Sequence, residues 1–207
     1  MDGVLLNSSP IHADAYQDAL CGLSIPNFRY SRVAGMRSAD GIRAILKENN
    51  IHLPEEQIAA LAQVKSMLAL VRIGAENPIV PGAVAVLEAL AGRTKLALAS
   101  SASEAGVNAF LDRNALRCFF QCALHSGDVR SAKPAPEIFE LAINRLGLSP
   151  ADALVVEDAV AGIQAAKAAG AVACGIPSTC GADELQRAGA DMIIDKLEDL
   201  LELGARA

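Results

Sequence analysis

The chain has 207 residues, which is long enough for one domain with an insertion or for two small domains. Hydrophobic residues make up 52% of it and charged residues 20%, an ordinary composition for a soluble globular protein. The net charge of -6 argues against a nucleic-acid binder and against a binder of acidic membranes. It does not exclude a small anionic ligand, because a metal ion and a few hydrogen-bond donors at a binding site make the electrostatic potential there positive.

The cysteines and the apolar runs bear on where the protein works. The five cysteines form neither a C-x-x-C pair nor a zinc-binding spacing, so we expect reduced, mostly buried thiols. No stretch approaches about 18 uncharged apolar residues, and no basic run precedes an apolar segment at the N-terminus. We therefore predict a cytoplasmic protein with no membrane span and no export signal, and we expect a monomer or a weak homodimer.

Helical patterns dominate residues 10–77. Segment 11–20 has apolar residues at helical spacing, and either Ser8 or Ser9 suits its N-cap. Similar patterns cover residues 40–48 and 54–71, where Pro54 suits a first helical turn. We therefore predict that residues 10–77 form a helical unit inserted between residues 1–9 and 78–207.

From residue 78 onward, short β-rich runs alternate with Ala-rich helical segments. The runs cover residues 95–99, 122–125, 153–156, 172–175 and 192–194. The helical segments cover residues 83–91, 105–113, 136–146, 159–169 and 182–188, with Gly147 and Gly170 placed as helix-ending glycines. This alternation predicts an α/β fold with a Rossmann-like parallel sheet that helices cover on both faces.

Polar side chains follow the predicted strands, where ligands bind in an open parallel sheet. They are Asp2 near the start of the chain, Ser100 and Ser101 after the run 95–99, Lys133 in a Pro-flanked loop, and Glu157 and Asp158 after the run 153–156. Adjacent carboxylates at a strand end are unfavourable unless a cation shares them, and oxygen ligands suit Mg²⁺. A lysine and a hydroxyl nearby would hold phosphate oxygens during phosphoryl transfer.

Four sequence pieces, in this order, resemble the haloacid dehalogenase superfamily, in the branch that holds β-phosphoglucomutase and the phosphoglycolate and sugar phosphatases. They are Asp2-Gly3-Val4, the apolar run ending in Ser100, Lys133-Pro134-Ala135-Pro136, and Glu157-Asp158 followed by Ala161-Gly162-Ile163. Each piece alone occurs by chance, but four in order on an α/β pattern form a specific signal that covers nearly the whole chain.

The resemblance implies a role for each of these residues. Asp2 would be the general acid and base, and its backbone carbonyl would face Mg²⁺. Ser100 would hydrogen-bond the phosphoryl group, Lys133 would pair with the nucleophile and the phosphate, and Glu157 and Asp158 would be acidic metal ligands.

The resemblance also implies that residues 10–77 are a cap that closes over the site and selects the substrate. His12, Arg37 and Ser101 are then candidates for substrate contact, and Arg37 suits a distal phosphate or a sugar oxygen. The chain departs from the family's usual start after the glycine motif, because Asn7-Ser8-Ser9 stands where D-S-E or D-T is common.

Each candidate also has a plainer interpretation. Asp2 could be a terminal residue without a role, Ser100 a helix N-cap, Lys133 a solvated loop lysine, the Glu157-Asp158 pair the charge at a helix N-terminus, and His12 and Arg37 exposed residues of the cap. His52 and His125 have no supporting partners, and we interpret them as structural or exposed.

The family's nucleophilic aspartate, itself a metal ligand, and the strand that carries it would lie immediately before Met1, so we expect the first strand to be largely absent. Either the sequence begins too late, or the protein has lost the chemistry. A central strand buries four or five apolar side chains worth roughly 1.5–3 kcal/mol each, against a domain stability of about 5–15 kcal/mol. The first explanation is therefore favoured, and the 207-residue chain should show negligible turnover.

The function predicted from the sequence is that of a Mg²⁺-dependent phosphohydrolase. It would act on a small phosphorylated metabolite, of the sugar-phosphate or phosphoglycolate type, through an aspartyl-phosphate. Two alternatives stay open: a hexose-phosphate mutase of the same family, and a catalytically inactive protein that binds phosphate and Mg²⁺. We predict no nucleic-acid partner.

Overall fold

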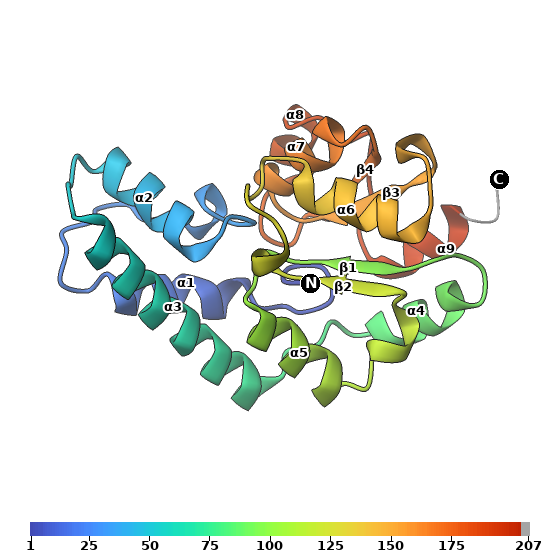
Figure 1. Ribbon diagram of the computed structural model, residues 1–207, viewed down its shortest axis with the longest axis horizontal. Helices are drawn as coiled ribbons and strands as arrows, with labels where there is room; N and C mark the ends of the chain where they lie inside the picture. The colour runs from blue at the N-terminus through green and yellow to red at the C-terminus, as the bar shows by residue number, and fades with distance from the viewer. Residues whose placement is uncertain (204–207) are drawn as a thin grey trace.

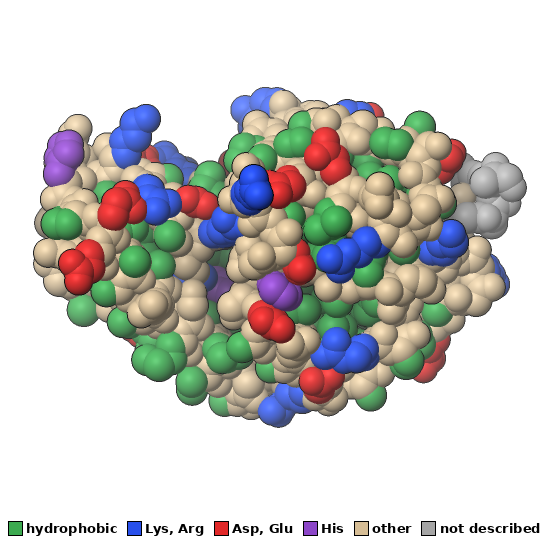
Figure 2. Space-filling model, viewed as in Figure 1, with side chains coloured by type: hydrophobic (Ala, Val, Ile, Leu, Met, Phe, Trp, Pro, Cys, Tyr) green, Lys and Arg blue, Asp and Glu red, His purple; other side chains and the backbone are tan. Residues whose placement is uncertain are grey.

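The computed structural model describes residues 1–203, and its chain forms a helical lobe and an α/β lobe (Figure 1). The helical lobe contains α1 (Ser9–Ala19), α2 (Ser38–Glu48) and α3 (Glu55–Glu76). In the space-filling view a notch separates the two lobes along the upper edge (Figure 2). The division of the chain at residues 10 and 77 stays a prediction, but the two lobes have separate hydrophobic cores.

The helical lobe is held together by apolar side chains that α1, α2 and α3 turn toward one another. Tyr16 of α1 and Ile42 of α2 are fully buried, and Ile58 of α3 packs with them. Gly41 permits this packing, because a Cβ there would collide with the Tyr16 hydroxyl. The Ser8 hydroxyl makes no capping bond to α1 and instead donates to Asp2 Oδ1 at 2.7 Å, which ties the start of this lobe to the site below.

Helix α3 is the most apolar long element of the described chain. It is long and apolar enough to cross a membrane by length and composition, although it carries Lys65 and Arg72. In this structure α3 packs against α1 and α2, with Ile58 and Ala62 in their shared core. Its outer face exposes Val64, Met67 and Val71.

The α/β lobe alternates strands and helices in the order that the sequence pattern predicts. Its strands are β1 (Ala97–Ala99), β2 (Cys122–Leu124), β3 (Leu154–Glu157), β4 (Val172–Gly175) and β5 (Met192–Ile193). Its helices are α4 (Ala83–Ala91), α5 (Glu104–Arg113), α6 (Glu137–Leu146), α7 (Val160–Ala168), α8 (Ala182–Arg187) and α9 (Leu200–Leu203). Gly147 and Gly170 follow α6 and α7 with positive φ angles of 66° and 78°, the conformation that lets a helix end without a Cβ clash.

The strands form two parallel sheets rather than one. One sheet pairs β1 with β2, and the other has the order β3-β4-β5. Within residues 1–203 no strand pairs with the remaining edge of β1 or of β3, and residues near the N-terminus make only isolated bridges, Asp2 with Leu6 and Leu6 with Ile79. The predicted α/β fold with parallel strands and a helical cap is confirmed.

Apolar side chains on both faces of the strands make the core of this lobe. One cluster joins Leu98 of β1 to Val107 and Phe110 of α5, and another joins Leu124 of β2 to Ile138 of α6 and Ile163 of α7. These buried helices fix the strand positions, and so they fix the residues that follow each strand.

Two other expectations concern the cysteines and the connection between the lobes. All five cysteines are free as predicted, but the expectation that most are buried is wrong, because only Cys174 and Cys180 are. The two chain segments that connect the lobes run side by side: Asn7 donates its backbone N–H to Pro78 at 2.7 Å, and Val80 donates to Leu5 at 2.9 Å.

Candidate active site

One cavity of about 390 Å³ lies between the two lobes, at the carboxyl ends of β1 and β3. Every residue that the sequence singles out for chemistry or binding lines it: Asp2, His12, Arg37, Ser100, Ser101, Lys133, Glu157 and Asp158. Pockets of this size are common for small ligands. The convergence follows from the parallel strands, whose carboxyl ends meet at one edge.

Lys133 forms a buried ion pair at the base of this cavity. Its Nζ lies 2.6 Å from Oε1 of Glu157, the last residue of β3, and 4.6 Å from the centre of the Phe139 ring. The Nζ also reaches the carbonyl oxygen of Ala99, at the end of β1, at 3.5 Å. Only 5% of Lys133 is exposed, so it is not a solvated loop lysine. The lysine therefore connects the ends of both sheets.

Glu157 and Asp158 are two adjacent, buried acids, and two glycines make room for them. A Cβ at Gly162 would overlap the Glu157 carboxylate, and a Cβ at Gly3 would overlap that of Asp158. Burial, together with the charge of Glu157, raises the pKa of Asp158 from 3.8 to about 7. The pair thus carries more negative charge than its surroundings accommodate, which is the condition of a site that needs a further cation.

Ser100 and Ser101 follow β1 at the same edge. Ser100 is buried, its N–H donates to Leu124 in β2 at 3.0 Å, and its hydroxyl accepts the N–H of Ala102 at 3.1 Å. The N-cap of α5 is Ser103, so Ser100 does not cap that helix. Ser101 donates its hydroxyl to the carbonyl of Gly35 at 2.6 Å, which is a contact between the α/β lobe and the helical lobe.

Asp2, His12 and Lys65 form a chain of hydrogen bonds that crosses from one lobe to the other. His12 Nε2 lies 3.0 Å from Oδ1 of Asp2, and Lys65 Nζ lies 3.1 Å from Nδ1 of His12. An ammonium only donates, so Nδ1 accepts from Lys65 and Nε2 carries the proton that points at Asp2. Burial would raise the pKa of the Asp2 carboxyl, but His12, the positive chain amine and the Ser8 hydroxyl outweigh it and hold that pKa below its usual value.

The family is shown by comparison with known proteins. A family model described as haloacid dehalogenase-like hydrolase matches residues 1–170. This chain is a haloacid dehalogenase-like hydrolase. The predicted family and the predicted phosphatase class of enzyme are thereby confirmed.

Relatives and solved structures agree with this family. The fructose-1-phosphate phosphatase YqaB of Escherichia coli is 31% identical over 174 residues, which cover 82% of this chain and 89% of that protein. The β-phosphoglucomutase of Bacillus subtilis is 28% identical over 209 residues, covering 96% and 92%. A hydrolase from Pseudomonas syringae has a TM-score of 0.89 at 26% identity, covering 100% of this chain and 96% of that one.

Sequence reasoning missed two side chains in the cavity of this haloacid dehalogenase-like hydrolase. Lys65 is 7% exposed, and burial lowers its pKa to about 8, although the charge of Asp2 acts against that shift. Tyr30 stacks on His12 with ring centres 5.9 Å apart. A lysine in a helix of mainly apolar residues was the available signal for Lys65. No comparable pattern marked Tyr30.

The side chain of Arg37 contacts the α/β lobe rather than open space. Its guanidinium donates to the carbonyl oxygens of Arg130 at 2.9 Å and Ser126 at 2.6 Å, and to that of Val129. Both ring nitrogens of His12 also face protein groups. Substrate contact by Arg37, His12 and Ser101 stays a prediction.

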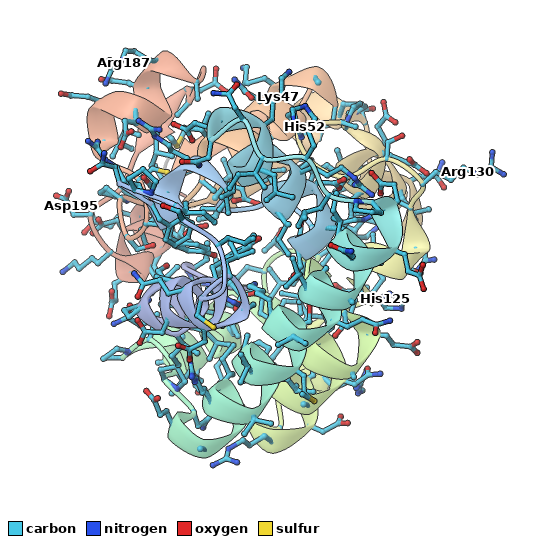
Figure 3. The ribbon with its side chains drawn as sticks, turned by 90° about the vertical axis from the view of Figure 1, so that its left-hand side faces the viewer. Lys47, His52, His125, Arg130, Arg187 and Asp195 are labelled. Atoms are coloured by element: carbon cyan, nitrogen blue, oxygen red, sulfur yellow. The ribbon has the colours of Figure 1, made fainter. Side chains whose placement is uncertain are left out.

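The other two histidines lie outside this cavity. His52 is exposed on the helical lobe, near Lys47, and His125 lies beside α5, 3.4 Å from Asp128 and 4.0 Å from Glu104 (Figure 3). The interpretation of both as structural or exposed residues agrees with these positions.

The residues present fit Mg²⁺, although no three His, Cys, Asp or Glu side chains within residues 1–203 are grouped as a complete metal site. Mg²⁺ usually takes one or two carboxylates and completes its shell with water and substrate phosphate. Two adjacent acids held over glycines, one with its pKa raised toward neutrality, match that need. Asp158, Glu157 and the backbone carbonyl of Asp2 are the groups that would hold the ion.

Met1 lies at the same cavity as these acids, and its amine is affected by their charges. The amine is buried, and burial lowers the pKa of the ammonium, while the charges of Asp2, Glu157, Lys133 and Asp158 also act on it. Met1 lines the cavity with these residues.

Proposed function

We propose that this chain belongs to a Mg²⁺-dependent phosphohydrolase for a small phosphorylated metabolite, of the sugar-phosphate or phosphoglycolate type. The enzyme acts in the cytoplasm as a monomer or weak homodimer. One observation carries the proposal: Lys133, Ser100, Asp2 and the Glu157–Asp158 pair converge on one cavity between a core and a helical lobe. The fructose-1-phosphate phosphatase named above supports the substrate class.

Each residue of the site has a defined task in this proposal. Lys133 and the Ser100 hydroxyl bind the non-bridging phosphate oxygens, where charge gathers during transfer. Asp2 must first be protonated, because the free site holds its pKa below the usual value. It then gives that proton to the leaving oxygen and regains one from the attacking water. When bound, Mg²⁺ supplies positive charge that neutralises the phosphate. The helical lobe keeps bulk water out of the cavity.

An aspartyl-phosphate mechanism needs a nucleophilic aspartate, and the test below supplies one ahead of Met1. Met1 lines the same cavity as Lys133, Glu157 and Asp158, so a carboxylate added there would lie near the phosphate that Lys133 holds. Its attack would form an aspartyl-phosphate as the P–O bond to the alcohol breaks, and water would then release inorganic phosphate.

The test compares three proteins: the 207-residue chain, the same chain preceded by a short apolar segment ending in Asp, and a matched version ending in Asn. We expect Mg²⁺-dependent phosphate release from p-nitrophenyl phosphate and sugar phosphates only with the Asp extension. Equal turnover by the 207-residue chain or the Asn version would show that the added carboxylate is not the nucleophile.

A mutase is the second candidate, because the Bacillus subtilis relative is a β-phosphoglucomutase and matches nearly the whole chain. The same extended protein distinguishes the two activities. A phosphohydrolase releases phosphate from β-glucose 1-phosphate, whereas a mutase converts it to glucose 6-phosphate. If neither reaction occurs but phosphate and Mg²⁺ still bind, the chain is a binding protein.

A further inference from the structure

The cavity continues beyond the catalytic groups as an arm between α3 and α5. One face of α3 lines it at helical spacing, through Lys65, Ser66, Ala69, Leu70, Ile73, Gly74 and Asn77. One face of α5 forms the opposite wall, through Gly106, Ala109, Phe110 and Arg113. Figures 1 and 3 show these two helices side by side. At a rise of 1.5 Å per residue, the α3 wall from Lys65 to Asn77 is about 18 Å long.

The walls of this arm are apolar or small over most of their length. Past Lys65 and Ser66, α3 presents Ala69, Leu70, Ile73 and Gly74 in turn. The wall on α5 consists of Gly106, Ala109 and Phe110 before Arg113, which is exposed. The catalytic end is instead lined by acids, lysines and hydroxyls, so the two ends of the cavity suit different parts of one ligand.

At the far end of the arm, a pair of side-chain amides ties α3 to α5. Asn77 Nδ2 donates to Asn114 Oδ1 at 2.9 Å, and Asn114 Nδ2 donates to Asn77 Oδ1 at 3.1 Å. This pair joins the residue after α3 to the residue after α5. The two amides therefore fix the spacing of the two helices at this end.

We propose that this arm is the subsite for the alcohol part of the substrate, and that the substrate is a phosphate monoester with an extended apolar body, alkyl or aromatic. This inference rests on the proposed function for the position of the phosphate, at Lys133 and Ser100, and it replaces the sugar-phosphate type of substrate with an apolar one. The ester oxygen then faces the arm, and an apolar body fills it with favourable burial. A sugar in the same place would bury hydroxyls against Ala69, Ile73 and Phe110, which offer side chains with no hydrogen-bond partner.

The first experiment measures binding, so it does not depend on turnover. Isothermal titration calorimetry of the Asn-extended protein with Mg²⁺ compares butyl, hexyl and octyl phosphate and 1-naphthyl phosphate with glycerol phosphate and fructose 1-phosphate. We expect Kd to fall about two- to fourfold for each methylene added along the alkyl series.

Two variants fill the arm and leave the catalytic end untouched. Gly74→Leu is suitable because open space surrounds the position of a Cβ there, and leucine favours a helix more than glycine does. Gly106→Leu fills the arm from α5, where a Cβ makes only ordinary contacts. Ala75→Leu is the matched control, because Ala75 is exposed and does not line the cavity.

The expected result is that Gly74→Leu and Gly106→Leu weaken octyl phosphate binding at least tenfold and leave glycerol phosphate binding unchanged, while Ala75→Leu changes neither. Equal affinity across the alkyl series, or no effect of either filling variant, would overturn the subsite and leave the proposed function standing. If inorganic phosphate with Mg²⁺ also fails to bind, the proposed function and the subsite both fall.

Discussion

The two lobes hold their polar groups in different ways. In the α/β lobe, Lys133 Nζ lies 2.6 Å from Oε1 of Glu157, the last residue of β3, and also reaches the carbonyl of Ala99 at the end of β1. In the helical lobe, Arg37 and His12 reach across the gap and take partners from the α/β lobe. The core therefore builds a site by itself, whereas the cap side chains shape it only when the lobes are together. The following experiments test this division.

The largest effect is expected at Lys133, on the core side. Lys133→Met removes the cation from a buried pair, so Glu157 and Asp158 keep their charges without it. We expect the free energy of unfolding to fall by about 3–5 kcal/mol at pH 7.5, as measured by urea denaturation. Lys167→Met breaks an exposed ion pair with Asp191 and serves as the control, with an expected loss below about 1 kcal/mol. Similar losses in both variants would contradict the buried role.

Asp2 lies at the boundary between the lobes, and its substitution tests the acid–base assignment. In the Asp-extended protein, Asp2→Asn should lower kcat for an alkyl phosphate about 10²- to 10³-fold. The loss should be much smaller for p-nitrophenyl phosphate, because nitrophenolate leaves without needing a proton. A steady-state comparison of the two substrates measures this difference. Equal losses on both would assign Asp2 to phosphate or metal binding instead.

Asp158 tests the excess negative charge of the core site. Since its pKa is raised from 3.8 to about 7, the folded chain keeps a proton that the unfolded chain has released. Its contribution to stability is therefore full below about pH 4 and is lost as the pH rises through 7. Without Mg²⁺, Asp158→Asn should raise the free energy of unfolding at pH 7.5 by about 1–3 kcal/mol.

The same variant separates charge from packing. Mg²⁺ should stabilise the unmodified chain against urea at pH 7.5 and should stabilise Asp158→Asn much less. An unchanged dependence of stability on pH in the variant would show that Asp158 does not titrate in this range.

The smallest effect is expected on the cap side, at Arg37. Arg37→Ala removes donors to three carbonyls of the α/β lobe, and in the Asp-extended protein we expect KM to rise about three- to tenfold, with kcat changed less. Arg37→Lys should not restore it, because one ammonium does not replace the planar fork. Arg130→Ala is the control, since its side chain points into solvent and its carbonyl stays in place (Figure 3). A kcat loss equal to that of Asp2→Asn would place Arg37 in the chemistry.

The sequence predicts the core side of the site better than the cap side, for a physical reason. Ser100 and Glu157 follow runs whose strand character is plain, and parallel strands bring their carboxyl ends together whatever the rest of the chain does. Lys65 and Tyr30 enter the cavity only because α3 and the Tyr30–Arg32 turn pack on α1. That packing depends on tertiary contacts, which the periodicity of a helix does not specify. The separation of the strands into two sheets likewise depends on which strands pair with each other, and the residues of one strand do not show this.

The paired segments at Leu5–Asn7 and Pro78–Val80 have a mechanical consequence. The chain leaves the α/β lobe and returns to it at one place. The two connections to the helical lobe therefore lie next to each other. A hinge motion of the helical lobe would be centred on this connection. Opening of the lobes would then break the hydrogen bonds that Arg37 and Ser101 make between them. The hydrophobic core of each lobe would stay intact.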